Sequence, residues 1–125
     1  MAHRPTICIV EDDTSLLHGL ARLLRGCGFE VEAFAYPEEV LRRLEAGSLH
    51  CTVLLLDIHL GEMSGFDLHN RLTKMGLSIP AIFMTGCDDA SHRERAAQVG
   101  AAAYLVKPFE DIELLGAIGA ALEKH

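Results

Sequence analysis

The segment Thr52-Val53-Leu54-Leu55-Leu56-Asp57 decides the fold of this 125-residue chain. The apolar run before Asp57 is too short for an ordinary helix and is interrupted by no polar residue. Such a run predicts a strand that is buried on both faces, as in a parallel sheet covered by helices. Asp57 then lies at the carboxyl end of a buried strand.

Four further short runs, rich in aliphatic and β-branched residues, repeat this pattern. They occupy residues 7–10, 29–34, 81–84 and 102–106. The longer segments that follow the runs carry apolar residues at helical spacing, which predicts a helix after each strand. Five strands alternating with five helices predict an α/β fold, (βα)5, built on a doubly wound parallel sheet.

Capping residues and glycines set the expected helix boundaries. The first helix should begin at Asp13 or Thr14 and end at Gly26 or Gly28. The second is entered through Pro37, because proline suits the first position of a helix. The glycines expected to end the next three helices are Gly47, Gly76 and Gly100.

The third and fourth helices differ in the apolar surface that their sequences offer. The residues that mark the third are Leu68, Leu72 and Met75. The fourth spans about residues 89–99, and its expected buried face is small: Ala90, Ala96, Ala97 and Val99. A helix that buries so little area should have low local stability, which makes this one the expected movable element.

The fifth helix is marked by Leu115, Ile118 and Leu122 and also contains Gly116 and Gly119. A glycine inside a helix costs about 1 kcal/mol relative to alanine. We therefore expect these glycines to allow close packing, either on the sheet or against a partner helix.

Composition excludes several classes of protein. Hydrophobic residues make up 50% of the chain, too many for a disordered segment. No run approaches the roughly 20 apolar residues of a membrane span. The net charge of −7 argues against direct nucleic-acid binding. The four cysteines lack zinc-site spacing and residues 1–5 are too polar for a signal peptide, so we expect a cytoplasmic protein without membrane association.

Polar or charged residues follow four of the five predicted strands. They are Glu11, Asp12 and Asp13 after the first, Asp57 after the third, Thr85 and Gly86 after the fourth, and Lys107 and Pro108 after the fifth. In an open parallel sheet, ligands bind outside the carboxyl ends of the strands, so these residues predict the site.

The residue types at this edge indicate a particular chemistry. Carboxylates without cysteine or histidine ligands suit a hard cation such as Mg²⁺. An aspartate beside the cation, Asp57, can accept a phosphoryl group, and Lys107 and Thr85 can hold the phosphoryl oxygens. Each feature alone is common: an acidic triplet is often only a solvated helix start. The combination favours a functional site.

The same residues resemble the response-regulator receiver domain of two-component signalling. The resemblance rests on Val10-Glu11-Asp12-Asp13, Leu56-Asp57 with Gly65 downstream, Met84-Thr85-Gly86 and Tyr104-Leu105-Val106-Lys107-Pro108-Phe109. It covers the whole chain, residues 1–125, as one domain, and the Thr-Gly and Lys-Pro-Phe-Glu-Asp segments are similar to the FixJ-like branch. It implies a CheY-like fold with the flavodoxin-like strand order 2-1-3-4-5.

The resemblance also implies roles for the site residues. Asp57 would accept a phosphoryl group from a histidine kinase or a phosphotransfer protein in a Mg²⁺-dependent reaction. The metal ligands would be Asp12, Asp57, the main-chain carbonyl of His59 and, through water, Glu11. Thr85 and Lys107 would contact the phosphoryl group. The domain would be a signalling receiver, not an enzyme.

A conformational switch is implied as well. Thr85 and Tyr104 would act as the switch pair, Tyr104 turning inward when Thr85 moves towards the phosphoryl group. The Lys107-Pro108 peptide bond would be cis. The face formed by the fourth helix, fifth strand and fifth helix would change and control an output domain or partner, or form a homodimer.

One departure from the family pattern lies beside the predicted metal site. Receivers carry a hydrophobic residue and then proline three and four positions after the phosphoacceptor, where this chain has Leu60 and Gly61. We expect a looser loop and weaker resting affinity for metal or phosphoryl group. His59 and Cys87 should flank the phosphoryl group.

Two other functions remain open at this stage: a receiver-like binding module that is never phosphorylated, and a phosphatase of the haloacid-dehalogenase type. Such phosphatases place a second aspartate two residues after the nucleophile, where this chain has His59. The chain is expected to be either a single-domain receiver or part of a longer regulator.

Overall fold

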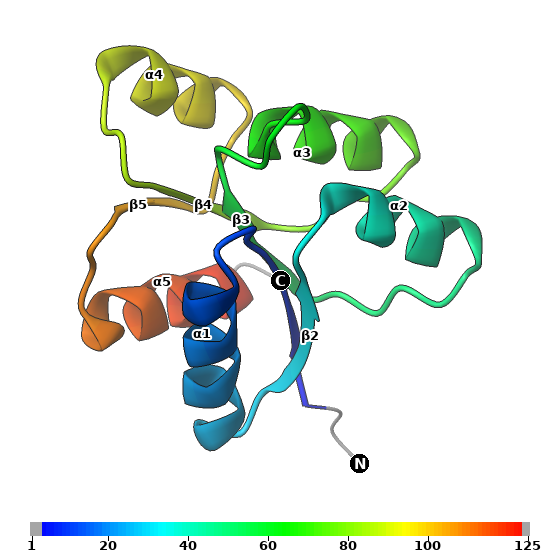
Figure 1. Ribbon diagram of the computed structural model, residues 1–125, viewed down its shortest axis with the longest axis horizontal. Coiled ribbons are helices and arrows are strands. Elements are labelled where there is room, and N and C mark those ends of the chain that lie inside the picture. Colours follow the sequence, from blue (N-terminus) through cyan, green and yellow to red (C-terminus); the bar gives the residue numbers. More distant parts are fainter. Residues whose placement is uncertain (1–3, 124–125) are drawn as a thin grey trace.

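The computed structural model describes residues 4–123, which form a five-stranded parallel sheet flanked by helices (Figure 1). The strands are β1 (Thr6–Val10), β2 (Glu30–Phe34), β3 (Val53–Asp57), β4 (Ala81–Thr85) and β5 (Ala103–Val106). Their order, β2-β1-β3-β4-β5, confirms the predicted fold and strand order. The expected domain limits, 1–125, include residues 1–3 and 124–125, which lie outside the described residues, as does most of the N-terminal segment judged too polar for a signal peptide.

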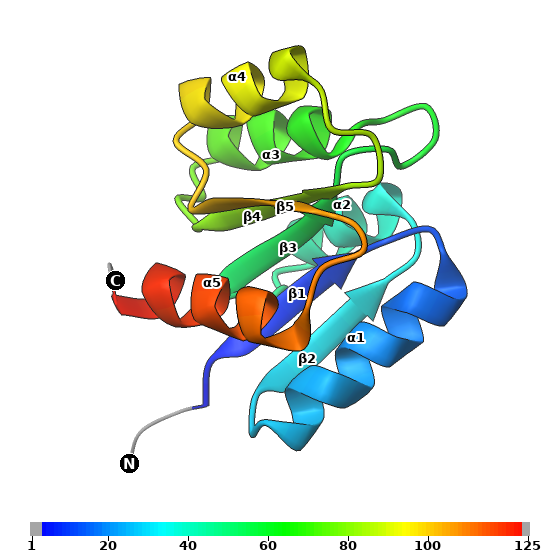
Figure 2. The ribbon, with the colours of Figure 1, turned by 90° about the vertical axis from the view of Figure 1, so that its left-hand side faces the viewer.

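The helices cover both faces of the sheet. They are α1 (Thr14–Gly26), α2 (Pro37–Glu45), α3 (Gly65–Lys74), α4 (Ala90–Gln98) and α5 (Asp111–Glu123). Helices α1 and α5 lie on one face and α2, α3 and α4 on the other (Figures 1 and 2). This arrangement explains the uninterrupted apolar runs, since the inner strands have no solvent-facing side.

Alternate residues of β3 contribute to two separate hydrophobic cores. Val53 and Leu55 pack in the core beneath α1 and α5, while Leu54 and Leu56 pack in the core beneath α2 and α3. All five residues of β3 are buried. The polar end of this strand, Asp57, is therefore held by packing on both sides.

Side-chain caps fix where three of the helices begin, and hence the loops beside the strand ends. Asp13 accepts a hydrogen bond from Leu16 N at the start of α1. Ser64 and Asp67 form a reciprocal capping box at the start of α3. Asp89 accepts a hydrogen bond from His92 N at the start of α4. The cap expected at Asp13 is confirmed, and the cap at Asp89 lies at the expected start of the fourth helix.

Helix α4 buries less than its sequence predicts. Ala96 is the one residue of α4 that is fully buried, and Ala90 and Ala97 are exposed. The expectation was therefore wrong for Ala90 and Ala97, whereas Val99, just after the helix, is partly buried against the core beneath α2 and α3. Helix α4 is therefore attached to the rest of the domain even more weakly than its sequence predicts.

Of the two kinds of close packing expected for the glycines of α5, the structure excludes packing on the sheet, and packing against a partner helix stays a prediction. An added Cβ at Gly116 or Gly119 would meet no atom within 4 Å, so neither packs closely on the sheet. The helix instead buries Leu114, Ile118 and Ala121. Met75, assigned to the apolar face of the third helix, is 49% exposed because it lies at the C-cap of α3.

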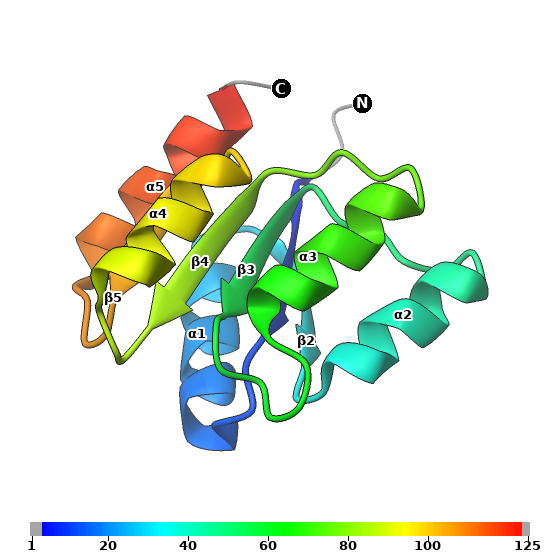
Figure 3. The same ribbon diagram turned by 90° about the horizontal axis from the view of Figure 1, so that it is seen from above.

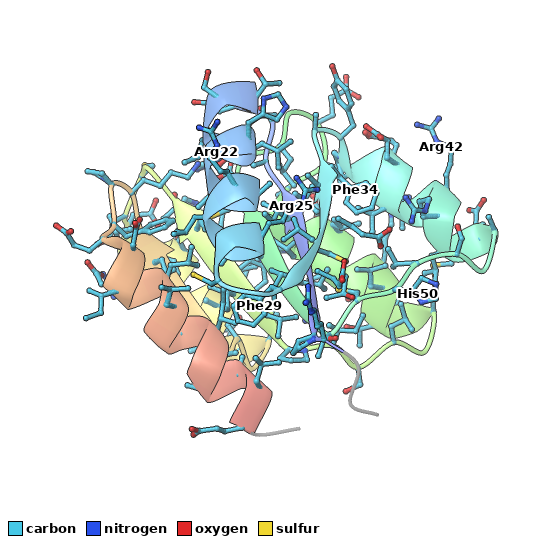
Figure 4. The ribbon with its side chains drawn as sticks, turned by 90° about the horizontal axis from the view of Figure 1, so that it is seen from below. Arg22, Arg25, Phe29, Phe34, Arg42 and His50 are labelled. Carbon is cyan, nitrogen blue, oxygen red and sulfur yellow. The ribbon has the colours of Figure 1, made fainter. Side chains whose placement is uncertain are left out.

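The outer edge of β2 is flanked by charged side chains from α1 and α2. Figure 4 shows Arg25 of α1 near this strand, and Arg25 Nη2 donates a 3.4 Å hydrogen bond to Val31 O. Arg43 of α2 pairs with Glu32. Charges of this kind discourage another strand from adding to a sheet edge. None of the helices described between residues 4 and 123 has the length and apolarity needed to cross a membrane.

Candidate functional site

Three carboxylates meet at the carboxyl ends of β1 and β3. Asp57 is the last residue of β3, and Glu11 and Asp12 directly follow β1. One oxygen from each lies within 4.8 Å of the others. Figure 3 shows β3 and β4 ending at the same edge of the sheet. Because β1 pairs with β3 in parallel, Glu11 and Asp12 meet Asp57, although 46 and 45 positions separate them from it in the sequence.

Lys107 brings a positive charge into the same cluster from the end of β5. Its Nζ lies 2.5 Å from Glu11 Oε1 and 3.3 Å from Asp57 Oδ1. The main chain of Lys107 is fixed by a 2.8 Å hydrogen bond from its N–H to Thr85 O, and the peptide bond to Pro108 is cis. The lysine thus neutralises part of the charge of two buried acids.

The environment shifts the titration of both partners in the Glu11–Lys107 pair. Burial raises the pKa of Glu11 to about 7, although hydrogen bonds from Lys107 and from Asp13 N oppose the shift. Burial alone would lower the pKa of Lys107, but its hydrogen bond to Glu11 and the charge of Asp57 outweigh burial and raise it. The lysine therefore stays charged between the two acids.

The donor set fits Mg²⁺. Glu11, Asp12 and Asp57 offer carboxylate oxygens, the ligands that this hard cation prefers, and no cysteine or histidine belongs to the cluster. Asp12 is exposed while Glu11 and Asp57 are buried, so the cluster opens to solvent on one side. This open side would let a cation keep several of its waters, as Mg²⁺ does in most protein sites.

Gly65 is needed because helix α3 begins against the backbone of Asp57. A Cβ at Gly65 would lie 2.4 Å from Asp57 O, which no side chain tolerates. Gly65 N also donates a 2.9 Å hydrogen bond to Ile58 O. The glycine that forms part of the sequence motif thus allows the start of α3 to fix the main chain around Asp57.

The β3–α3 loop contains the departure from the family pattern at Leu60 and Gly61. Gly61 has φ +86°, in the left-handed region, and Leu60 is buried in the core beneath α2 and α3. Proline, whose φ is fixed near −65°, cannot adopt this conformation. The glycine therefore specifies a different turn, one that Leu60 anchors to the core, and the expected effect on metal affinity stays a prediction.

Thr85, the last residue of β4, is buried and directs its hydroxyl to its own loop. The hydroxyl donates to Cys87 O at 3.0 Å and accepts from Cys87 N at 2.9 Å. Its role towards a phosphoryl group stays a prediction, because Cys87 rather than Asp57 is its described partner.

Tyr104, on β5, has its hydroxyl at the surface. It donates a 3.0 Å hydrogen bond to Asp88 Oδ1, and the guanidinium of Arg93 lies 4.9 Å from the centre of its ring. Arg93 also donates to both carboxylate oxygens of Asp88 at 2.8 and 2.9 Å. Burial and the bond to Asp88 raise the pKa of Tyr104.

His59 lies two residues after Asp57 and contacts His92 of α4, their ring centres being 5.2 Å apart. His92 Nδ1 is 2.9 Å from Cys87 O, so this nitrogen carries the proton and donates. The role of the His59 main-chain carbonyl as a metal ligand stays a prediction.

Sequence reasoning missed Asp88, His92 and Arg93 as parts of this region. In the sequence, His92 and Arg93 are ordinary polar residues of a helix whose apolar positions are all alanine or valine. The signal that could have indicated more is position: an acid just before the helix cap and a basic residue in the first turn of α4 can meet across that turn.

Known proteins resemble this chain in both sequence and structure. The family model described as "Response regulator receiver domain" matches residues 7–119. A curated relative, "Response regulator protein TmoT" of Ectopseudomonas mendocina, is 38% identical over 94% of this chain and 52% of its own length. This chain spans about half the length of the curated relatives it matches.

Two solved structures superpose closely. A "response regulator receiver domain protein (CheY-like)" from Methanospirillum hungatei JF-1 has a TM-score of 0.88 at 30% identity, covering 98% of this chain and 96% of that one. The structure titled FixJ-N has a TM-score of 0.87 at 31% identity, covering 99% and 98%.

Proposed function

This chain belongs to the response regulator receiver domain family, and from that premise we propose that Asp57 accepts a phosphoryl group from a histidine kinase or a phosphotransfer protein. The observation that carries the proposal is the cluster of Glu11, Asp12, Asp57 and Lys107 at the strand ends. We place this exchange in the cytoplasm. Receiver domains are signalling domains and not enzymes in the usual sense.

In this proposal, each residue of the cluster has a distinct task. Asp57 is the carboxylate nucleophile, and only 4% of its surface is exposed. Lys107, 3.3 Å from Asp57 Oδ1, would hold a phosphoryl oxygen by charge. The hydroxyl of Thr85 would leave Cys87 and donate to another phosphoryl oxygen. Phosphorylation then adds charge at a place where Lys107 already offsets two acids.

Mg²⁺ is the cofactor that these residues would hold. Asp12 and Asp57 would be direct ligands, Glu11 would act through water, and the His59 main-chain carbonyl would complete the protein's share. When bound, the cation supplies positive charge that offsets the carboxylates and the incoming phosphoryl oxygens. The cation would also make it easier to ionise Glu11, whose pKa is raised by burial.

The output of the domain would be a change at α4, β5 and α5. Helix α4 is weakly attached, and Tyr104 of β5 lies beside it. The exposed positions of Gly116, Gly119 and Ile112 leave the surface of α5 free for a partner helix. We propose that this face pairs with a second copy or with an output domain of a longer regulator, and that the chain forms one receiver domain over 1–125. The acidic chain itself would not bind nucleic acid or membranes.

Incubation with a small phosphodonor and Mg²⁺, followed by intact-mass analysis, tests this function. We expect one added phosphoryl group that hydroxylamine removes, and none on Asp57→Asn. Asp67→Asn, at the exposed capping box of α3, is the matched control and should be modified like the wild type.

The same experiment separates the two alternatives. A wild-type chain that stays unmodified with Mg²⁺ present would contradict the proposal and favour an unphosphorylated binding module. Steady release of phosphate from a phosphomonoester would favour a haloacid-dehalogenase-type phosphatase.

A further inference from the structure

Both predicted switch residues are bonded to neighbouring positions of one loop. This loop, residues 86–89, joins β4 to α4. The hydroxyl of Thr85 makes two hydrogen bonds with the main chain of Cys87, and the hydroxyl of Tyr104 donates to the carboxylate of the next residue, Asp88. A movement of this loop therefore affects both side chains at once.

The first turn of α4 holds the loop in place from the other side. His92 Nδ1 donates to the same Cys87 carbonyl that accepts from Thr85, at 2.9 Å. Arg93 donates to both carboxylate oxygens of Asp88, in the bidentate geometry that makes guanidinium–carboxylate pairs specific. Its guanidinium also lies over the Tyr104 ring. The two adjacent loop residues are thus each bound by one switch residue and one helix residue.

The two main-chain groups of Cys87 are affected differently when the Thr85 hydroxyl turns away from them. The main chain of Thr85 is fixed in the sheet by the bond from Lys107 N, so only its side chain can move. If the hydroxyl leaves, Cys87 O keeps a donor in His92 and is not left unpaired, which lowers the cost of the change. Cys87 N loses its partner, which frees the loop and with it Asp88.

We propose that Asp88, His92 and Arg93 are positioning residues that form a latch, hereafter the Asp88 latch, which holds Tyr104 outward in the resting state and releases it when Thr85 leaves Cys87. This inference rests on the proposed function and deepens it. Asp88 couples the two switch residues because it follows Cys87 in the chain and accepts a hydrogen bond from Tyr104. The pair Asp88–Arg93 sets how much of the unphosphorylated protein adopts the active arrangement.

The latch is strong enough to bias the resting state and weak enough to open. The side chains of Asp88 and Arg93 are 35% and 58% exposed. Exposed ion pairs contribute little, typically a factor of about two to five in an equilibrium. Removing the latch should therefore raise the fraction of unphosphorylated protein in the active arrangement by about two to five times. A ligand that selects the active arrangement should then bind more tightly by the same factor.

The test is the affinity of beryllofluoride with Mg²⁺, a phosphoryl analogue, measured by calorimetry on Asp88→Ala and Arg93→Met. We expect both variants to bind about two to five times more tightly than the wild type. Glu94→Ala, an exposed change in the same turn of α4, is the matched control and should bind like the wild type. Equal affinity in wild type, Asp88→Ala and Arg93→Met would overturn the latch.

A second measurement examines the variant without any phosphoryl analogue bound. The Tyr104 ring resonance of unligated Asp88→Ala should move towards its position in beryllofluoride-saturated wild type. A ring that stays where it is in unligated wild type would overturn the latch even if beryllofluoride binds. A wild type that fails to bind beryllofluoride would contradict the proposed function. Normal binding by the wild type, together with an unmoved Tyr104 resonance in Asp88→Ala, would contradict the latch alone.

Discussion

The acidic cluster and the β4–α4 loop lie at the same edge of the sheet, yet they are built in opposite ways. Glu11 and Asp57 are buried, and Lys107 lies between them with its main chain fixed in the sheet. The loop, residues 86–89, is exposed throughout. Its bonds to Tyr104 and Arg93 are made by side chains that water can reach.

This difference explains how one small domain can combine a rigid reaction site with a loop that changes conformation. Buried, packed groups keep their geometry, as a phosphoacceptor beside a cation requires. Exposed pairs are worth little and can be exchanged at low cost. A modest free energy from phosphorylation can therefore rearrange the loop without disturbing the cluster.

The largest expected effect comes from removing a charge in the cluster. Lys107→Met would leave Glu11 and Asp57 buried without their cation and should lower the free energy of unfolding by about 3 kcal/mol at neutral pH. Urea unfolding measures this, and added Mg²⁺ should recover part of the loss. Arg93→Met removes an exposed cation from the first turn of α4 and should lower the free energy of unfolding by less than about 1 kcal/mol. Equal losses in the two variants would abolish the contrast between the regions.

The second effect tests whether the main chain around Asp57 is fixed by close packing. Gly65→Ala places a Cβ against Asp57 O and should cost about 2 kcal/mol in unfolding free energy, with weaker Mg²⁺ binding. Gly86→Ala is the matched control in the movable loop, where the new Cβ meets no atom within 4 Å. If Gly65→Ala unfolds like the wild type, α3 does not constrain the site as described.

A third test concerns the turn at Gly61, between the fixed cluster and the solvent. Restoring the family's proline, Gly61→Pro, should destabilise the fold by more than about 1 kcal/mol because φ +86° is closed to proline. Thermal unfolding would show it, with Glu62→Ala as the control at the exposed neighbour. A stabilised Gly61→Pro protein with tighter Mg²⁺ binding would instead support the expectation of a merely loosened loop.

The smallest expected effect is on the titration of Tyr104. Burial and the bond to Asp88 raise the pKa of its hydroxyl above its ordinary value. Asp88→Ala removes the acceptor and a negative charge beside the phenolate, so the pKa should fall towards the ordinary value. Ultraviolet titration of the phenol would detect this fall, and a pKa that does not move would show that Asp88 and Tyr104 are not coupled.

The sequence predicted the fixed region far better than the movable one. Short apolar runs defined the strands, and parallel strands must end at one edge, so Asp57 and Lys107 could be placed together from pattern alone. Gly65 was part of the motif, but its necessity became clear only from the approach of α3 to Asp57.

The latch could not be predicted in the same way. Whether Asp88 faces Tyr104, Arg93 or water depends on the path of an exposed loop, which no hydrophobic period determines. The exposure of Ala90 and Ala97 was missed for a related reason: alanine fits both a buried and an exposed helix face.

The claim that the fixed cluster drives the movable loop can be tested by one measurement on the protein labelled with fluorotyrosine. The chain has two tyrosines, and Tyr36, 63% exposed at the start of α2, serves as an internal reference. Phosphorylation of Asp57 in the presence of Mg²⁺ should shift the fluorine resonance of Tyr104 and leave that of Tyr36 in place. Stoichiometric phosphorylation with an unmoved Tyr104 resonance would contradict the account.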